Sequence, residues 1–271
     1  MFSKLVTAGR RSLGVGLLLA CVEAVAGCAA PPGTRVEAVP TAVEEGPRRP
    51  LSRIAPRLRA LIRAGEALWQ RPPVEDNTIA CATCHFDGVE FEEWATSFPK
   101  VRPMPPPFTR VMTLQQAVGE SVATHYRIPP GSRNRQVSRA ITAYLSWIGE
   151  GRPFTPGVAA RQPVFPHRMA ALRESIARGR AHVERSCAGC HADFARFGEV
   201  AATFPRVPRA GAAVMTLEEY LQDHTGPAWD SPEAADIAAF VTARAQGRIL
   251  QPGGTLQPQQ PTEGDSDELA I

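Results

Sequence analysis

One short pattern, Cys-x-x-Cys-His, constrains this chain more than any other feature because it occurs twice. The first copy is CATCH, Cys81–His85, and the second is CAGCH, Cys187–His191. In both copies a Phe-Pro pair begins 13 residues after the histidine, at Phe98 after His85 and at Phe204 after His191. The chain is therefore expected to build the same local structure twice.

The repeat extends on both sides of each cysteine motif. GEALW (65–69) matches GRAHV (179–183) ahead of the motifs, VMTLQQAV (111–118) matches VMTLEEYL (214–221) after them, and ITAYL (141–145) matches IAAFV (237–241) at the end. Two modules with the same order of elements are therefore expected.

The apolar spacing in these segments is helical. Apolar residues recur at helical intervals over 52–69, and no segment alternates strongly enough to indicate a strand. Thr113 and Thr216 stand where helix N-caps belong, and Glu219 follows Thr216 at the spacing of a capping box. The sequence predicts an all-α fold in which each module contains a helix, a cysteine motif, a Phe-Pro loop, a Thr-capped helix and a final helix.

The spacing of the cysteine motif has a definite chemistry. Residues i, i+3 and i+4 share one face of a helical turn, so two thiols and an imidazole point the same way. Cys-x-x-Cys-His is the attachment signature of heme c. Cys81, Cys84, Cys187 and Cys190 are expected to bond to the vinyl groups, and His85 and His191 to bind iron, giving two covalent heme c groups. A four-cysteine zinc site would leave both histidines unexplained, and a redox Cys-x-x-Cys would need a strand before it.

These residues resemble those of diheme cytochromes c built from two tandem class I cytochrome c-like domains. The resemblance covers about residues 60–150 and 170–247, where GEALW, GRAHV, ITAYL and IAAFV match the paired terminal helices of that family. The Phe-Pro and Thr-Leu segments also resemble the diheme cytochromes of sulfur oxidation and thiosulfate dehydrogenation. In those proteins a cysteine on the helix after Thr-Leu is the distal ligand of one heme. No cysteine of this chain occupies that place.

Each iron also needs a distal ligand, because that ligand sets its potential and reactivity. His224 comes seven residues after Leu217, at the place of the family's cysteine. Ser121 comes seven residues after Leu114, and His125 follows one helical turn later on the same face. His125 and His224 are the expected distal ligands.

Other residues remain alternatives for the distal positions. Met112 and Met215 occupy equivalent places in the two repeats, although a methionine before a Thr cap is also typical of core packing. Met104 lies in a Met-Pro pair without a counterpart in the second repeat. His182 and His167 are expected to be packing or surface residues. Trp69 and Trp147 are expected near a heme or between modules, since they lie on the two helices expected to cross.

The N-terminus has the features of an export signal. Lys4, Arg10 and Arg11 precede an apolar stretch that ends in VAGC (25–28), which resembles a bacterial lipoprotein box with Cys28 as the lipidated residue. Ordinary cleavage after AVA and a rival box at LLAC (18–21) are the alternatives. A periplasmic protein, attached to the membrane through lipidated Cys28, is expected.

The chain divides into six expected segments. They are a lipoprotein signal peptide (1–28), a flexible tether (29–52), heme c domain 1 (53–150), a Pro- and Gly-rich linker (151–166), heme c domain 2 (167–248) and a disordered tail (249–271).

A diheme protein with two histidines on each iron is expected to carry electrons between redox partner proteins. The net charge of +3 is too small to argue for nucleic acid. The alternatives are a diheme oxidoreductase acting on a small sulfur substrate, a diheme peroxidase, and a heme-bearing subunit of a larger respiratory complex. The missing ligand cysteine disfavours the first, and no distal acid-base pair supports the second.

Overall fold

The computed structural model describes residues 46–74, 77, 79–85, 91–103, 109–158, 165–191, 194, 196–209 and 211–254. Contacts divide the chain into Met1–Thr41 and Ala42–Ile271, and the described residues all belong to the second unit. The predicted signal peptide with Cys28, most of the tether, Met104 and residues 255–271 lie outside the described residues. No helix within the described ranges is long and apolar enough to span a membrane.

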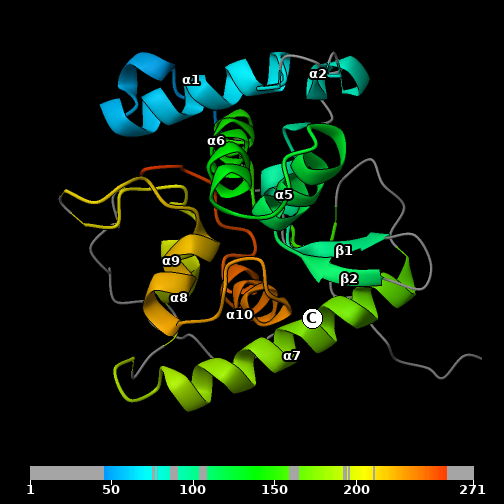
Figure 1. The fold of residues 1–271 in the computed structure, drawn as a ribbon. Coiled ribbons are helices and arrows are strands. Elements are labelled where there is room, and N and C mark those ends of the chain that lie inside the picture. The colour runs from blue at the N-terminus through cyan, green and yellow to red at the C-terminus, as the bar shows by residue number, and fades with distance from the viewer. Residues whose placement is uncertain are drawn as a thin grey trace, which may run out of the picture. The chain divides into compact units, whose positions relative to one another are not determined.

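The described part of the chain is mainly helical (Figure 1). The N-terminal half contains a 3₁₀ turn (Leu51–Arg53), α1 (Pro56–Gln70), α2 (Cys81–Cys84), α4 (Trp94–Ser97), β1 (Lys100–Pro103), β2 (Thr109–Met112), α5 (Leu114–His125) and α6 (Ser132–Ile148). The C-terminal half contains α7 (Pro166–Ser186), α8 (Arg196–Ala201), α9 (Leu217–Thr225) and α10 (Pro232–Ala243). The predicted order of helix, cysteine motif, Phe-Pro loop, Thr-capped helix and final helix is found in both halves.

The prediction of an all-α fold is wrong at one place, where β1 and β2 form an antiparallel hairpin. Lys100 pairs with Met112, and Val101 pairs with Val111. Each strand has only four residues, which is too short for alternation to stand out in the sequence. The second half has a one-pair counterpart, because Arg206 and Met215 form an isolated antiparallel bridge.

The first and last helices of each half cross at a glycine. A Cβ on Gly65 of α1 would lie 2.0 Å from the carbonyl oxygen of Ala140 on α6, and one on Gly179 of α7 would lie 1.9 Å from that of Asp236 on α10. The two backbones approach this closely only because glycine has no side chain. The crossings explain why a glycine opens both GEALW and GRAHV.

Both predicted threonine caps are present. The Thr113 hydroxyl accepts from the N–H of Gln116 at 3.3 Å, and the Thr216 hydroxyl accepts from the N–H of Glu219 at 3.3 Å. The side chain at the third helical position accepts from the threonine N–H in return, which completes a capping box in each half. Both Phe-Pro bonds, Phe98-Pro99 and Phe204-Pro205, are cis. The sequence repeat is thus a repeat of backbone conformation.

The two halves pack through apolar and polar contacts. Val101 and Val111 of the hairpin pack against Leu172 of α7 and Ala239 of α10. The predicted linker begins as packed structure, since Phe154 is buried and Thr155 and Gly157 donate to the carbonyls of Thr96 and Ser97 at 2.9 Å. The division into two heme c domains at 151–166 stays a prediction.

Candidate functional site

The first cysteine motif forms one turn of helix, α2, as its spacing requires. The N–H of His85 donates to the carbonyl of Cys81 at 3.0 Å, which closes the turn. The Cys81 sulfur lies 3.1 Å from the hydroxyl of Tyr126, and that hydroxyl donates to the carbonyl of Leu68 at 2.6 Å. Cys81 and Cys84 are free thiols. The turn is therefore fixed against both α1 and the end of α5.

A cavity of about 530 Å³ opens beside this motif. Cys81, Cys84 and His85 line it, and so do Ser121 and His125 of α5. The rest of its wall is mostly apolar, with Trp69, Leu114, Val118, Val122, Ile141 and Leu145 among the lining residues. Cofactor sites are typically apolar cavities of about 300–1,000 Å³ with a few polar groups. The expected proximal and distal residues thus share one cofactor-sized space.

Aromatic rings surround His85. Its ring centroid lies 5.9 Å from Trp69, 5.5 Å from Phe91 and 5.1 Å from Trp94. Trp69 lines the cavity, as expected for a residue near the cofactor. Trp147 packs between the halves, as expected, in an apolar cluster with Val207 and Val214 of the C-terminal half, and its indole N–H donates to the carbonyl of Arg49 at 3.0 Å.

The second motif forms the same turn directly after α7. The N–H groups of Cys190 and His191 donate to the carbonyl of Cys187 at 3.0 Å and 2.9 Å. The ring of His191 lies 6.1 Å from the ring of His224, centroid to centroid. A metal lies about 2.0–2.1 Å from an imidazole nitrogen, and that nitrogen lies about 1.1 Å from the centre of its ring. Two imidazoles on either side of one metal therefore have ring centroids about 6 Å apart. The spacing of this pair suits one iron between the rings.

The two expected distal histidines lie near the ends of their helices. His125 is the last residue of α5, and its carbonyl accepts from the side-chain amide of Asn77 at 2.5 Å. His224 lies in the last turn of α9, stacked on Tyr220 with the ring centroids 5.3 Å apart. Both side chains are exposed, so neither imidazole has to leave the core before one of its nitrogens can bind a metal.

The rival ligands lie in other environments. Met112 is fully buried in the apolar core of the N-terminal half and is not among the residues that line the 530 Å³ cavity. Met215 is half-buried and its backbone pairs with Arg206. The Nδ1 of His182 lies 2.8 Å from a carboxylate oxygen of Glu233, and exposed His167 lies against Phe165. The core-packing interpretation of Met112 fits its burial, and the assignment of all distal ligands stays a prediction.

Burial affects two of the four motif thiols. Burial raises the pKa of the Cys81 thiol, while its hydrogen bond with Tyr126 acts in the opposite direction. Burial also raises the pKa of Cys187. Within the described ranges no group of three or more His, Cys, Asp or Glu side chains could hold a metal ion. Heme supplies four of the iron ligands itself, so it needs only one or two from the protein, and the residues present fit heme c.

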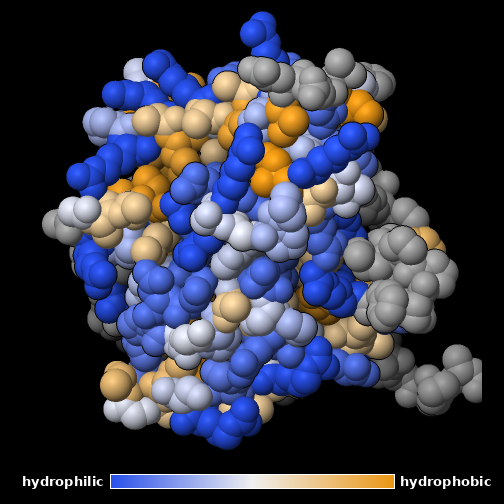
Figure 2. Space-filling view, in the orientation of Figure 1, coloured by the Kyte–Doolittle hydropathy of each residue, from blue (hydrophilic) through white to orange (hydrophobic). Residues whose placement is uncertain are grey.

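The sequence did not reveal the part of the first cavity that comes from the C-terminal half. Phe165, Arg168 and Met169, at the start of α7, line the cavity together with Gly157. Phe165 and Ile79, which also lines it, are 39% and 50% exposed. Figure 2 shows apolar residues reaching the surface below α1 and beside α2 in the upper part of the view. These contacts join residues far apart in the chain, so no local spacing could have indicated them.

No family model matches the chain, and no curated protein matches it.

Proposed function

We propose that this protein is a periplasmic diheme cytochrome c that transfers electrons between redox partner proteins, with two class I-like heme c domains and a lipid anchor at Cys28. The observation that carries the proposal is the 530 Å³ apolar cavity, which brings Cys81, Cys84, His85 and His125 together. Heme c, when bound, supplies a one-electron couple at its iron.

Each residue of the two sites has a specific role in the proposal. Cys81 and Cys84 would hold the first heme by thioether bonds, and His85 and His125 would bind its iron. Cys187, Cys190, His191 and His224 would do the same for the second heme. The aromatic rings around His85 would tune the potential through the apolar surroundings that they give the ligand.

Electron transfer is favoured over catalysis because both irons have two candidate imidazoles. The 6.1 Å spacing of the His191 and His224 ring centroids would allow both imidazoles to bind one iron, and that iron would then have no free position for a substrate. Ser121 takes the place where the resembled sulfur-oxidising proteins have a ligand cysteine, and it lines the first cavity beside His125. A fully ligated iron exchanges electrons without binding a substrate.

The proposal is tested on protein matured in a host competent for heme ligation. We expect the ferric protein to be low-spin at both irons by electron paramagnetic resonance, and the ferrous protein not to bind carbon monoxide. Electrons should pass reversibly to a small redox mediator. A high-spin iron or a thiolate signature in the wild type would contradict the carrier function and favour an enzyme.

A further inference from the structure

The wall of the first cavity has a charge pattern that the cysteine motif and the histidines do not explain. Arg102 of β1 and Arg168 of α7 line it, both half-buried, and so does Lys100, and the described residues that line it include no Asp or Glu. Cations that gather in a largely apolar cavity without acids create a positive potential there. Such a cavity favours a ligand that carries negative charge on one part and is apolar on the rest.

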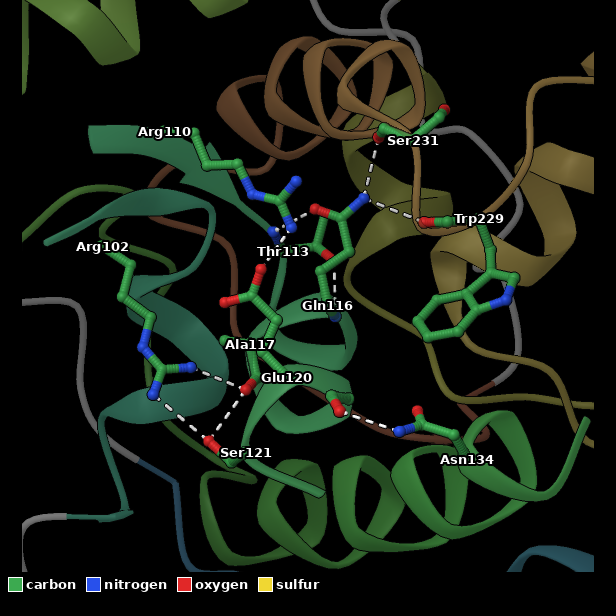
Figure 3. A network of polar contacts seen from close by, with 11 residues as sticks. Arg102, Arg110, Thr113, Gln116, Ala117, Glu120, Ser121, Asn134, Trp229 and Ser231 are labelled. Carbon is green, nitrogen blue, oxygen red and sulfur yellow. Dashed lines mark hydrogen bonds and ion pairs between the residues drawn. The ribbon is translucent and has the colours of Figure 1, made fainter. Parts of the chain in front are cut away.

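Arg102 is held by neutral oxygens. Its guanidinium donates to the carbonyl of Ala117 at 2.7 Å and to the hydroxyl of Ser121 at 3.2 Å (Figure 3). Glu120, which lies on α5 with Ala117 and Ser121, forms an ion pair with Arg110 at 2.5 Å. Within the described ranges Arg102 forms no ion pair, and two bonds use only part of the five N–H donors of a guanidinium. Arg102 is thus positioned along α5 with its charge not neutralised by an acid.

Arg168 occupies an unfavourable place for a cation. It lies in the first turn of α7, where the helix dipole is positive, and that turn contains no acidic residue. Its guanidinium carbon lies 4.5 Å from the centroid of the Phe165 ring, and among the described residues it forms no ion pair. Arg168 and the helix terminus together would stabilise an anion at this end of the cavity.

We propose that Arg102 and Arg168 bind the two carboxylates of the first heme, an inference that rests on the function proposed above. The carboxylates of heme lie on the edge opposite the vinyl groups. Cys81 and Cys84 would fix the vinyl edge at α2, so the carboxylate edge would point away from α2, toward the residues of β1 and α7 that also line the cavity. Arginine forms bidentate bonds with carboxylates, and a half-buried carboxylate needs such a partner.

The first heme site is therefore shared between the two halves of the chain. Its bonding and axial residues come from the N-terminal half, whereas Arg168, Phe165 and Met169 of the C-terminal half close it. The packing of α7 on the β1–β2 hairpin brings them there. The potential of the first heme should consequently depend on a residue of the second half.

Arg102→Gln and Arg168→Gln test the proposal, with Arg173→Gln as the matched control because Arg173 is an exposed residue of α7 that does not line the cavity. Heme content and both midpoint potentials are measured on the full-length protein. The first heme is identified as the one whose spectrum changes in His125→Ala. We expect both glutamine variants to keep two hemes and to lower the potential of the first heme only, since each loses a positive charge that favours the added electron. Arg168→Lys should restore most of the shift, and Arg173→Gln should cause none.

Two results would overturn the proposal while leaving the proposed function intact. One is a pair of unchanged potentials in Arg102→Gln and Arg168→Gln with two hemes still attached. The other is a first-heme potential that responds to these substitutions only after sulfate is added, which would assign the arginines to a soluble anion. A wild-type chain without covalent heme would instead contradict the proposed function.

Discussion

At the scale of single residues, the two halves present their expected distal histidines differently. His224 stands at the position that corresponds to Ser121, whereas His125 lies one helical turn beyond Ser121. Both Ser121 and His125 line the same cavity, because residues about four apart share a helix face. This part of the site could be predicted from the sequence, since it depends only on spacing along one helix. Arg168 could not be predicted, since its place depends on how two distant segments pack.

Replacing His224 by alanine tests the second axial position. We expect His224→Ala to convert one of the two hemes from low-spin to high-spin or to a form that binds cyanide, because His191 would be left alone on its iron. His182→Ala is the matched control, as His182 pairs with Glu233 instead. Ferric electron paramagnetic resonance measures the outcome, and an unchanged low-spin spectrum would exclude His224 as a ligand.

A buried carboxyl at the junction of the halves gives a pH prediction. Burial raises the pKa of Glu218, while hydrogen bonds with Thr113 and Thr216 act in the opposite direction. The folded state thus holds a proton that the unfolded state releases at lower pH. The contribution of protonated Glu218 to the free energy of unfolding is complete below the ordinary carboxyl pKa and declines as pH rises toward the raised pKa.

Glu218→Gln should therefore stabilise the protein at neutral pH and flatten the fall of stability above the ordinary carboxyl pKa. The repeat supplies the precedent, because Gln115 occupies the equivalent position in α5 and is also buried. Urea unfolding at a series of pH values measures this. A variant less stable than the wild type at neutral pH, with the same pH dependence, would show that Glu218 is ionised in the folded protein.

At the scale of elements, each half is organised by a helix crossing and a capped helix. The crossings at Gly65 and Gly179 and the caps at Thr113 and Thr216 lie in matched segments, so the sequence predicted these elements and their order. The hairpin escaped prediction because each strand has only four residues and the residues of α7 and α10 that pack on its valines are distant in the sequence. Local patterns were sufficient for helices and caps, and insufficient for contacts between segments.

Gly65→Ala tests the first crossing. Alanine is favoured over glycine inside a helix by about 1 kcal/mol, so a loss of stability can come only from the contact with α6. We expect a net loss of about 1–3 kcal/mol in the free energy of unfolding, as is typical of overpacking. Ala64→Ser, at an exposed position of the same helix, should change stability little. Chemical unfolding measures both, and a Gly65→Ala protein as stable as the wild type would show that α1 and α6 do not approach this closely.

At the scale of the molecule, a buried ion cluster joins the halves. Glu219 of α9 is fully buried and pairs with Arg135 at 2.8 Å and Arg139 at 2.6 Å, both on α6. Gln115 of α5 also donates to Glu219 at 3.2 Å, and the Thr216 hydroxyl donates to Gln115. The capped helices of the two halves are thus joined by hydrogen bonds between their side chains. The repeat gave two modules, but nothing in their spacing indicated that they share a buried polar contact.

Glu219→Gln should destabilise both halves together. Removing one partner of a buried ion pair costs about 3–5 kcal/mol, and because both arginines are partly exposed we expect about 2–4 kcal/mol. Circular dichroism and tryptophan fluorescence should each show a single unfolding transition, for the wild type and for the variant. Glu184→Gln, which breaks an exposed pair with Arg180, is the control and should cost about 0.5 kcal/mol or less. Two separate transitions in the wild type would contradict the coupling of the halves.

The most direct test of the whole account is the intact mass of the denatured, reduced chain after maturation in a host that ligates heme c. We predict the mass of the processed polypeptide with its lipid plus two hemes, falling by one heme in Cys81→Ala/Cys84→Ala and by one in Cys187→Ala/Cys190→Ala. A wild-type polypeptide that carries no porphyrin under these conditions would contradict the account.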